Sequence, residues 1–145
     1  MENHHLDYIS KINFITSEID GLYHQASIKL GLNDSTSRVL YTLMKQSGSC
    51  MISDIYKQSG IGKQTVNSAL RKLEEAGIVY LEQFDGRTKI VKFTDKGKKY
   101  ADNTIAKLIV AETKAYEQWS ESEIVQYLEL SRKFLHTFRE EVKKL

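Results

Sequence analysis

The stretch from Ile52 to Gly97 constrains the fold most, because it holds two short helical patterns, a glycine turn between them and a hairpin pattern after them. Ser53 is a good N-cap for the first helix, and Gly60 can take the left-handed conformation that ends it. From Lys63 to Ala76 the apolar residues recur with the spacing of one buried helical face: Val66, Ala69, Leu70 and Leu73. A helix, a tight turn and a second helix are therefore predicted.

A β-hairpin is predicted directly after the second helix. Gly77 can end that helix, and the residues from Ile78 to Phe84 have a β-like composition. Asp85-Gly86 is a strong hairpin-turn signal, and Lys89 to Phe93 forms the returning strand. The short apolar run from Cys50 to Ile52 could pair as a third, minor strand. The order helix, turn, helix, hairpin predicts a winged helix.

The outer face of the second helix is rich in hydrogen-bond donors of the kind that read base edges and phosphates in a major groove. Its members are Lys63, Gln64, Thr65, Asn67, Ser68, Arg71 and Lys72. Many such faces are merely solvated, but the charge distribution favours DNA. Residues 57–99 hold ten basic and five acidic residues, a net charge of +5, whereas residues 1–56 carry −2 and residues 100–145 carry −1. A localised basic surface is what phosphate binding requires.

A specific resemblance lies in the hairpin. The segment D-G-R-T-K-I-V-K-F-T-D-K-G, from Asp85 to Gly97, resembles the wing signature D-x-R-x-K-x-V-x-L-T-x-x-G of the multiple-antibiotic-resistance regulator (MarR) family, with Phe93 where the family usually has Leu. Upstream, L-x-x-L-E-x-x-G-I-V from Leu70 to Val79 resembles the end of the family's recognition helix. The resemblance covers nearly the whole chain. It implies a sequence-specific, ligand-responsive repressor that binds a double-stranded DNA operator as a homodimer.

The helices outside residues 33–97 are expected to form the dimer. Residues 6–30 read as one long helix that is apolar on more than one face, which is typical of a helix with two packing partners. Asn33 or Asp34 is expected to cap a helix that ends near Gln46. Residues 98–145 hold the rest of a helix from Asp95 to about Trp119 and a last helix, which the Ser120-Glu123 capping box starts. Packing within one chain is the alternative to a homodimer.

The fold class predicted for residues 1–145 is therefore mainly α, a winged helix-turn-helix with a small hairpin wing and long terminal dimerisation helices. Arg87 and Lys89 on the wing are expected to contact DNA in addition to the residues of the second helix, with Arg87 entering the minor groove. A local ion pair between Arg87 and Asp85 is the alternative. A protein-binding adaptor with the same fold, without specific DNA binding, is the second hypothesis for the whole chain.

The sequence shows no motif for catalysis or for binding a metal or cofactor. The chain has no P-loop, GxGxxG, HExxH or CxxC motif, and its four histidines are scattered, so neither an enzyme nor a metal or cofactor site is predicted. The single cysteine, Cys50, is expected to be a buried structural thiol, and it does not lie in the first helix, where peroxide-sensing members of the family place theirs. The chain has no apolar run of membrane-spanning length and no signal-peptide core at its start, so no membrane association and a cytoplasmic location are expected.

The chain also contains candidate residues for a pocket that would bind a small aromatic or phenolic effector. Aromatic and methionine side chains could line its pocket between the dimer helices and the DNA-reading lobe, although residues with this spacing are more often part of a core. The candidates are Tyr8, Tyr23, Tyr41, Met44 and Tyr100.

Overall fold

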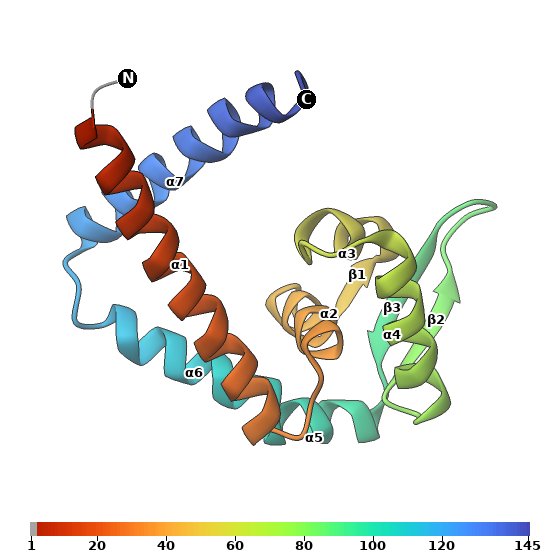
Figure 1. The fold of residues 1–145 in the computed structure, drawn as a ribbon. Coiled ribbons are helices and arrows are strands. Elements are labelled where there is room, and N and C mark those ends of the chain that lie inside the picture. The colour runs from red at the N-terminus through yellow and green to blue at the C-terminus, as the bar shows by residue number, and fades with distance from the viewer. Residues whose placement is uncertain (1–2) are drawn as a thin grey trace. The chain divides into compact units, whose positions relative to one another are not determined.

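The computed structural model describes residues 3–145, which form seven helices and one three-stranded antiparallel sheet (Figure 1). The helices are α1 (Asn3–Lys29), α2 (Asp34–Lys45), α3 (Ile52–Gln58), α4 (Lys63–Glu75), α5 (Asp95–Asn103), α6 (Ile105–Tyr116) and α7 (Glu121–Val142). The strands are β1 (Ser49–Met51), β2 (Val79–Gln83) and β3 (Lys89–Phe93). The mainly α fold with a small hairpin wing is confirmed.

The sheet contains the third strand that the sequence predicts. Its order is β1-β3-β2, so β3 pairs with both neighbours. Val91 of β3 lies opposite Cys50 on one side and Leu81 on the other. The hairpin between β2 and β3 extends beyond the helices around it (Figure 1).

Two local predictions are wrong. Ser53 does not cap α3, because the chain passes directly from β1 into the helix and the extended Met51 is the N-cap, with no side-chain hydrogen bond. The single helix expected from Asp95 to Trp119 is broken at Thr104, whose φ of −126° and ψ of −94° are not helical. The Thr104 hydroxyl donates to the carbonyl oxygen of Tyr100 at 2.7 Å, a local bond with which threonine competes with the helical pattern.

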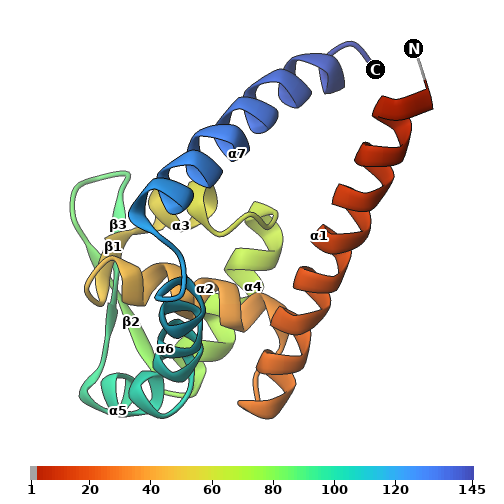
Figure 2. The ribbon, with the colours of Figure 1, turned by 90° about the vertical axis from the view of Figure 1, so that its left-hand side faces the viewer.

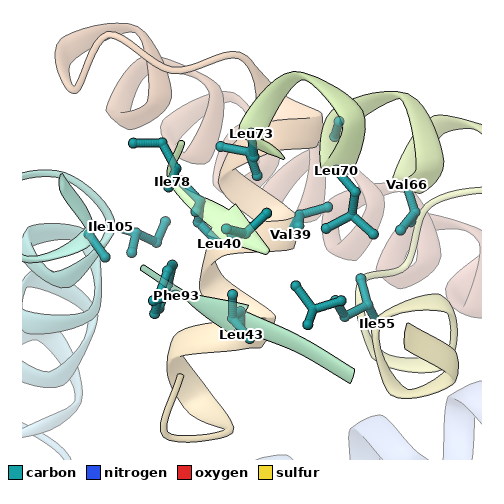
Figure 3. Packing of buried hydrophobic residues seen from close by; sticks show 14 of the residues in the cluster. Val39, Leu40, Leu43, Ile55, Val66, Leu70, Leu73, Ile78, Phe93 and Ile105 are labelled. Atoms are coloured by element: carbon teal, nitrogen blue, oxygen red, sulfur yellow. The ribbon is translucent and has the colours of Figure 1, made fainter. Parts of the chain in front are cut away.

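The hydrophobic core lies between α2, α4 and the sheet (Figure 3). Leu40 and Leu43 of α2, Ile55 of α3 and Val66 of α4 are completely buried. Each fully buried aliphatic side chain of this size contributes about 1.5–3 kcal/mol. This packing holds α4 in place while leaving its opposite face in solvent.

The chain divides into two compact units, one ending at Leu108 and the other spanning Ile109–Leu145. In the first unit, α1 joins the lobe through its C-terminal end, which lies beside α2 (Figure 2). The buried hydroxyls of Ser27 and Ser37 lie 2.8 Å apart at that junction. The rest of α1 carries large exposed apolar residues, among them Ile12 at 60% exposure.

In the second unit, α7 begins with the predicted capping box: the Ser120 hydroxyl accepts from the Glu123 backbone N–H, and the Glu123 carboxylate accepts from the Ser120 backbone N–H. The bonds that Glu123 makes at this cap lower its pKa. No residue of α7 is buried within the protomer, although its apolar line includes Leu135 at 56% exposure.

Candidate nucleic-acid interface

Helix α4 presents the polar face that the sequence predicts. Its four apolar residues are buried, and seven donor-rich residues are exposed: Lys63, Gln64, Thr65, Asn67, Ser68, Arg71 and Lys72. The Ser68 hydroxyl donates to the carbonyl oxygen of Gln64 at 3.1 Å, so its proton is used within the helix. The other exposed side chains of this face lie along one surface and can reach the edges of successive base pairs.

The start of α4 is electrostatically suited to a phosphate. Its N-cap is Gly62, which offers no side-chain hydrogen bond to the first-turn N–H groups, and the first turn contains no acidic residue. Free N–H groups and the positive end of the helix dipole attract anions. Lys63 adds a full positive charge at the same end.

Sequence reasoning missed Tyr56 of α3, which contacts two residues of the α4 face. Its hydroxyl donates to Oδ1 of Asn67, and the Nζ of Lys63 lies 5.1 Å from the centroid of its ring. The ring itself packs against the hydrophobic core. No short-range spacing could have revealed this contact, because Tyr56 and Asn67 lie on different helices and are eleven residues apart.

The turn between α3 and α4 is fixed by the fold. Gly60 has a φ of +73°, the left-handed conformation that the sequence predicts for this glycine. Arg38 of α2 donates from Nη1 to the carbonyl oxygen of Ser59 at 3.3 Å. These contacts set the direction in which α4 leaves the turn.

The end of α4 is tied to the wing through Thr94. Its hydroxyl accepts from the Gly97 backbone N–H at 2.9 Å, as an N-cap of α5, and donates to the carbonyl oxygen of Gly77 just after α4. Its backbone N–H donates to the carbonyl oxygen of Ile78 at 3.1 Å. Lys96 donates from Nζ to the carbonyl oxygen of Ala76 at 2.8 Å. Thr94 and its neighbours therefore fix the orientation of the wing relative to the reading helix.

The wing tip differs in detail from the predicted hairpin turn. Gly86 does not take a positive φ, and the loop closes through a 2.9 Å bond from Phe84 N–H to Thr88 O. The Asp85 carboxylate organises this loop by accepting from the backbone N–H groups of Arg87 and Thr88, each at 2.9 Å. The bond from Arg87, followed by those from Thr88, lowers the pKa of Asp85.

The local ion pair that was the alternative role for Arg87 is not formed. Asp85 binds the backbone of Arg87, and the Arg87 guanidinium makes no ion pair with any residue in the described part of the chain. Arg87 is exposed, as is Lys89 at the start of β3. Both charges are therefore available to a ligand outside the protomer.

Lys92 is committed within the sheet. Its Nζ lies 2.6 Å from a carboxylate oxygen of Glu82 on β2, and this contact raises the pKa of Lys92. Lys89 is consequently a better phosphate partner than Lys92 on this strand.

The structure separates the residues predicted to line an effector pocket. Tyr41, Met44 and Tyr100 are half-buried against the core, whereas Tyr8 and Tyr23 are exposed on α1. With about 1.5 Å of helical rise per residue, Tyr8 and Tyr23 are roughly 22 Å apart along α1. One small-molecule site within the protomer cannot include both.

Cys50 is buried in the sheet, as expected of a structural thiol. Burial, and then the negative charge of Asp54, raises the pKa of Cys50 from 9.0 to about 11. Residues 3–145 contain no group of three acidic, cysteine or histidine side chains placed to hold a metal ion. None of the helices described in this chain is long and apolar enough to cross a membrane.

Comparisons with known proteins support the interpretation of this surface as a DNA-binding one. Residues 27–97 match the family model of the sugar-specific transcriptional regulator TrmB. The structure of a MarR family regulator from Neisseria meningitidis is similar to this one, with a TM-score of 0.84, 16% identity, and coverage of 94% of this chain and 97% of that one. AbsC, a MarR family regulator from Streptomyces coelicolor, has a TM-score of 0.77 and 14% identity, over 96% and 97% of the two chains.

Another similar structure is that of BpsR from Bordetella bronchiseptica, whose DNA binding is regulated by 6-hydroxynicotinic acid. It has a TM-score of 0.64 and 18% identity, over 86% of this chain and 98% of that one. No curated protein sequence matches the chain. The similar structures show that the chain has the winged-helix fold of MarR family regulators, and together with the family model that matches residues 27–97 they support a DNA-binding transcriptional regulator.

Proposed function

We propose that this regulator is a repressor that acts as a homodimer on a pseudo-palindromic operator. The observation that carries the proposal is the exposed donor-rich face of α4 beside a wing with two exposed cations, Arg87 and Lys89. Helix α4 would read base edges in the major groove, and Arg87 would enter the adjacent minor groove. Repression would be steric, because the bound dimer covers the operator.

Dimerisation is proposed from the exposed apolar residues of the terminal helices. Helix α1 exposes Leu6, Ile12 and Ile15, and α7 exposes Leu128, Leu135 and Phe138. A helix that exposes several large apolar side chains along its length is uncommon on a monomer and is typical of an interface. A two-fold dimer would place two α4 helices about one duplex turn, ~34–36 Å, apart.

We further propose that a small aromatic or phenolic effector shifts the spacing of the two reading helices. The regulation of the Bordetella protein by 6-hydroxynicotinic acid, a hydroxylated aromatic acid, supports this class. An effector can act only through different affinities for the two arrangements. Release of operator-bound protein by hydroxylated aromatic acids, compared with sugars because residues 27–97 match a sugar-specific family, would identify the class.

Selection from a random duplex library with the full-length protein tests the proposed function. We expect enrichment of an inverted repeat, and a binding constant for the selected duplex that falls steeply between ~50 and ~200 mM salt. A scrambled duplex of the same composition is the control. A protein-binding adaptor would enrich no sequence and show no such salt dependence. In this proposal the protein works in the cytoplasm and performs no catalysis.

A further inference from the structure

We infer that Tyr56 sets the base preference of the reading helix by holding the amide of Asn67 in one orientation. This inference rests on the proposed function, because it names the base that one α4 residue would select. The observation behind it is the contact between an α3 side chain and two exposed residues of α4.

The contact engages neighbouring positions on one helical face. Lys63 and Asn67 are four residues apart on α4 and therefore lie side by side. The Tyr56 ring lies below the Lys63 ammonium, whose Nζ is 5.1 Å from the ring centroid. The Tyr56 hydroxyl donates to Oδ1 of Asn67. Because the ring also packs against the core, Tyr56 is a fixed point from which both side chains are held.

This hydrogen bond gives the oxygen and the NH₂ group of the Asn67 amide different roles. An asparagine amide has one acceptor oxygen and an NH₂ group with two donors. Oδ1 accepts from Tyr56 and is turned toward α3, which leaves the NH₂ group as the part of the amide available to DNA. Asn67 is exposed, so a base edge in the major groove can reach that group.

The NH₂ donors of Asn67 that remain available favour a base that presents hydrogen-bond acceptors. Guanine presents two acceptors in the major groove, O6 and N7, whereas adenine presents the acceptor N7 and the donor N6–H₂. The usual asparagine–adenine pair needs both ends of the amide, because Oδ1 accepts from N6–H₂. Oδ1 keeps a second lone pair, but its bond with Tyr56 turns it toward α3, so Asn67 presents its NH₂ group and favours guanine over adenine at the base pair that it contacts. Tyr56 is thus a positioning residue for specificity.

Tyr56→Phe in the full chain tests the inference. Phenylalanine keeps the ring against the core and beneath Lys63 but removes the hydroxyl, so the melting temperature should hardly change. Freed from Tyr56, the Asn67 oxygen could accept from adenine. We expect the guanine-over-adenine preference at one position of each half-site to fall roughly fivefold to tenfold in selection from the random duplex library. Tyr80→Phe, which removes the hydroxyl of an exposed tyrosine on β2, should leave the profile unchanged.

Asn67→Ala shows whether the two residues act together. It should abolish the preference at the same base pair, and Tyr56→Phe should have no further effect in its presence. A wild-type protein that enriches a sequence, with an unchanged profile in Tyr56→Phe, would overturn this inference alone. A change at a base pair that Asn67→Ala does not affect would also overturn it. A wild-type protein that enriches no sequence would overturn the proposed function and this inference with it.

Discussion

The backbone of Gly97 lies so close to Ile78 that a Cβ atom added to Gly97 would stand only 1.8 Å from the carbonyl oxygen of Ile78. This contact brings the first turn of α5 against the entry to β2. It explains why the wing signature ends in glycine: the Thr94 cap draws the Gly97 N–H inward, and any side chain at Gly97 would meet the Ile78 backbone.

Gly97→Ala should destabilise the protein, because rigid backbone cannot yield to the added methyl group. We expect a loss of about 3 kcal/mol or more in the free energy of unfolding, measured by urea denaturation. Gly21→Ala is the matched control. Gly21 lies within α1 with nothing within 4 Å of its added Cβ, so alanine there should be neutral or stabilise the protein by about 0.5–1 kcal/mol. An equal effect of the two substitutions would contradict this account of Gly97.

The charge of Arg87 on the wing is predicted to matter for DNA binding and not for the stability of the fold. Arg87→Ala should weaken operator binding strongly while leaving the melting temperature nearly unchanged, because the exposed guanidinium has no ion pair among the described residues. Arg87→Lys should restore only part of the affinity, because an ammonium is a more strongly hydrated point charge than a planar guanidinium. Fluorescence anisotropy and thermal denaturation of the same samples provide the two measurements. A lower melting temperature with intact affinity would show that the wing does not contact DNA.

The dimer prediction uses the exposed apolar line of α7. Leu135→Asp should convert the protein to a monomer in analytical ultracentrifugation and weaken operator binding, because a charge would be buried at the interface. Gln126→Asp, at an exposed polar position of the same helix, should leave the dimer intact. Truncation after Ser120 should abolish both dimerisation and tight binding. A truncated protein that binds the operator as well as the full chain would refute the proposed dimer.

Cys50 gives a prediction for alkaline pH. Its folded-state pKa of about 11 lies above the ordinary value of 9.0, so the unfolded chain releases the thiol proton first as the pH rises. The contribution of Cys50 to stability is therefore complete below pH 9 and is lost between pH 9 and 11. From pH 7 to ~10 the wild-type protein should lose about 1 kcal/mol more unfolding free energy than Cys50→Ala. Equal losses in the two proteins would contradict the raised pKa.

Periodic and capping signals in the sequence predicted much of the fold. Val66 and Leu70 recur with helical spacing and are buried, and Asn33 and Ser120 cap the helices expected of them. These features depend on residues a few positions apart. The Asp85-Gly86 turn signal placed the hairpin, and the resemblance to the wing signature drew attention to Gly97.

Other features depend on contacts that no short-range pattern contains. The contact between Tyr56 and Asn67 joins two helices, and the break at Thr104 depends on a hydroxyl that either continues or interrupts a helix according to its surroundings. At the wing tip, Asp85 was correctly placed in a turn, but its carboxylate accepts from the backbone N–H groups of Arg87 and Thr88 and does not form the ion pair with the Arg87 guanidinium that was the alternative. Side-chain partners of this kind follow from the assembled fold.

The most direct test of the central claim, that α4 reads the operator, is a titration of the selected duplex and its scrambled counterpart with the wild type, Gln64→Ala and Arg71→Ala. Each substitution should cost about 1–3 kcal/mol on the selected duplex and reduce discrimination at particular base pairs, because each removes a donor from the exposed face. Gln118→Ala, an exposed glutamine outside the winged-helix lobe, should bind as the wild type does. Unchanged affinity and unchanged sequence preference in both α4 variants would contradict the account.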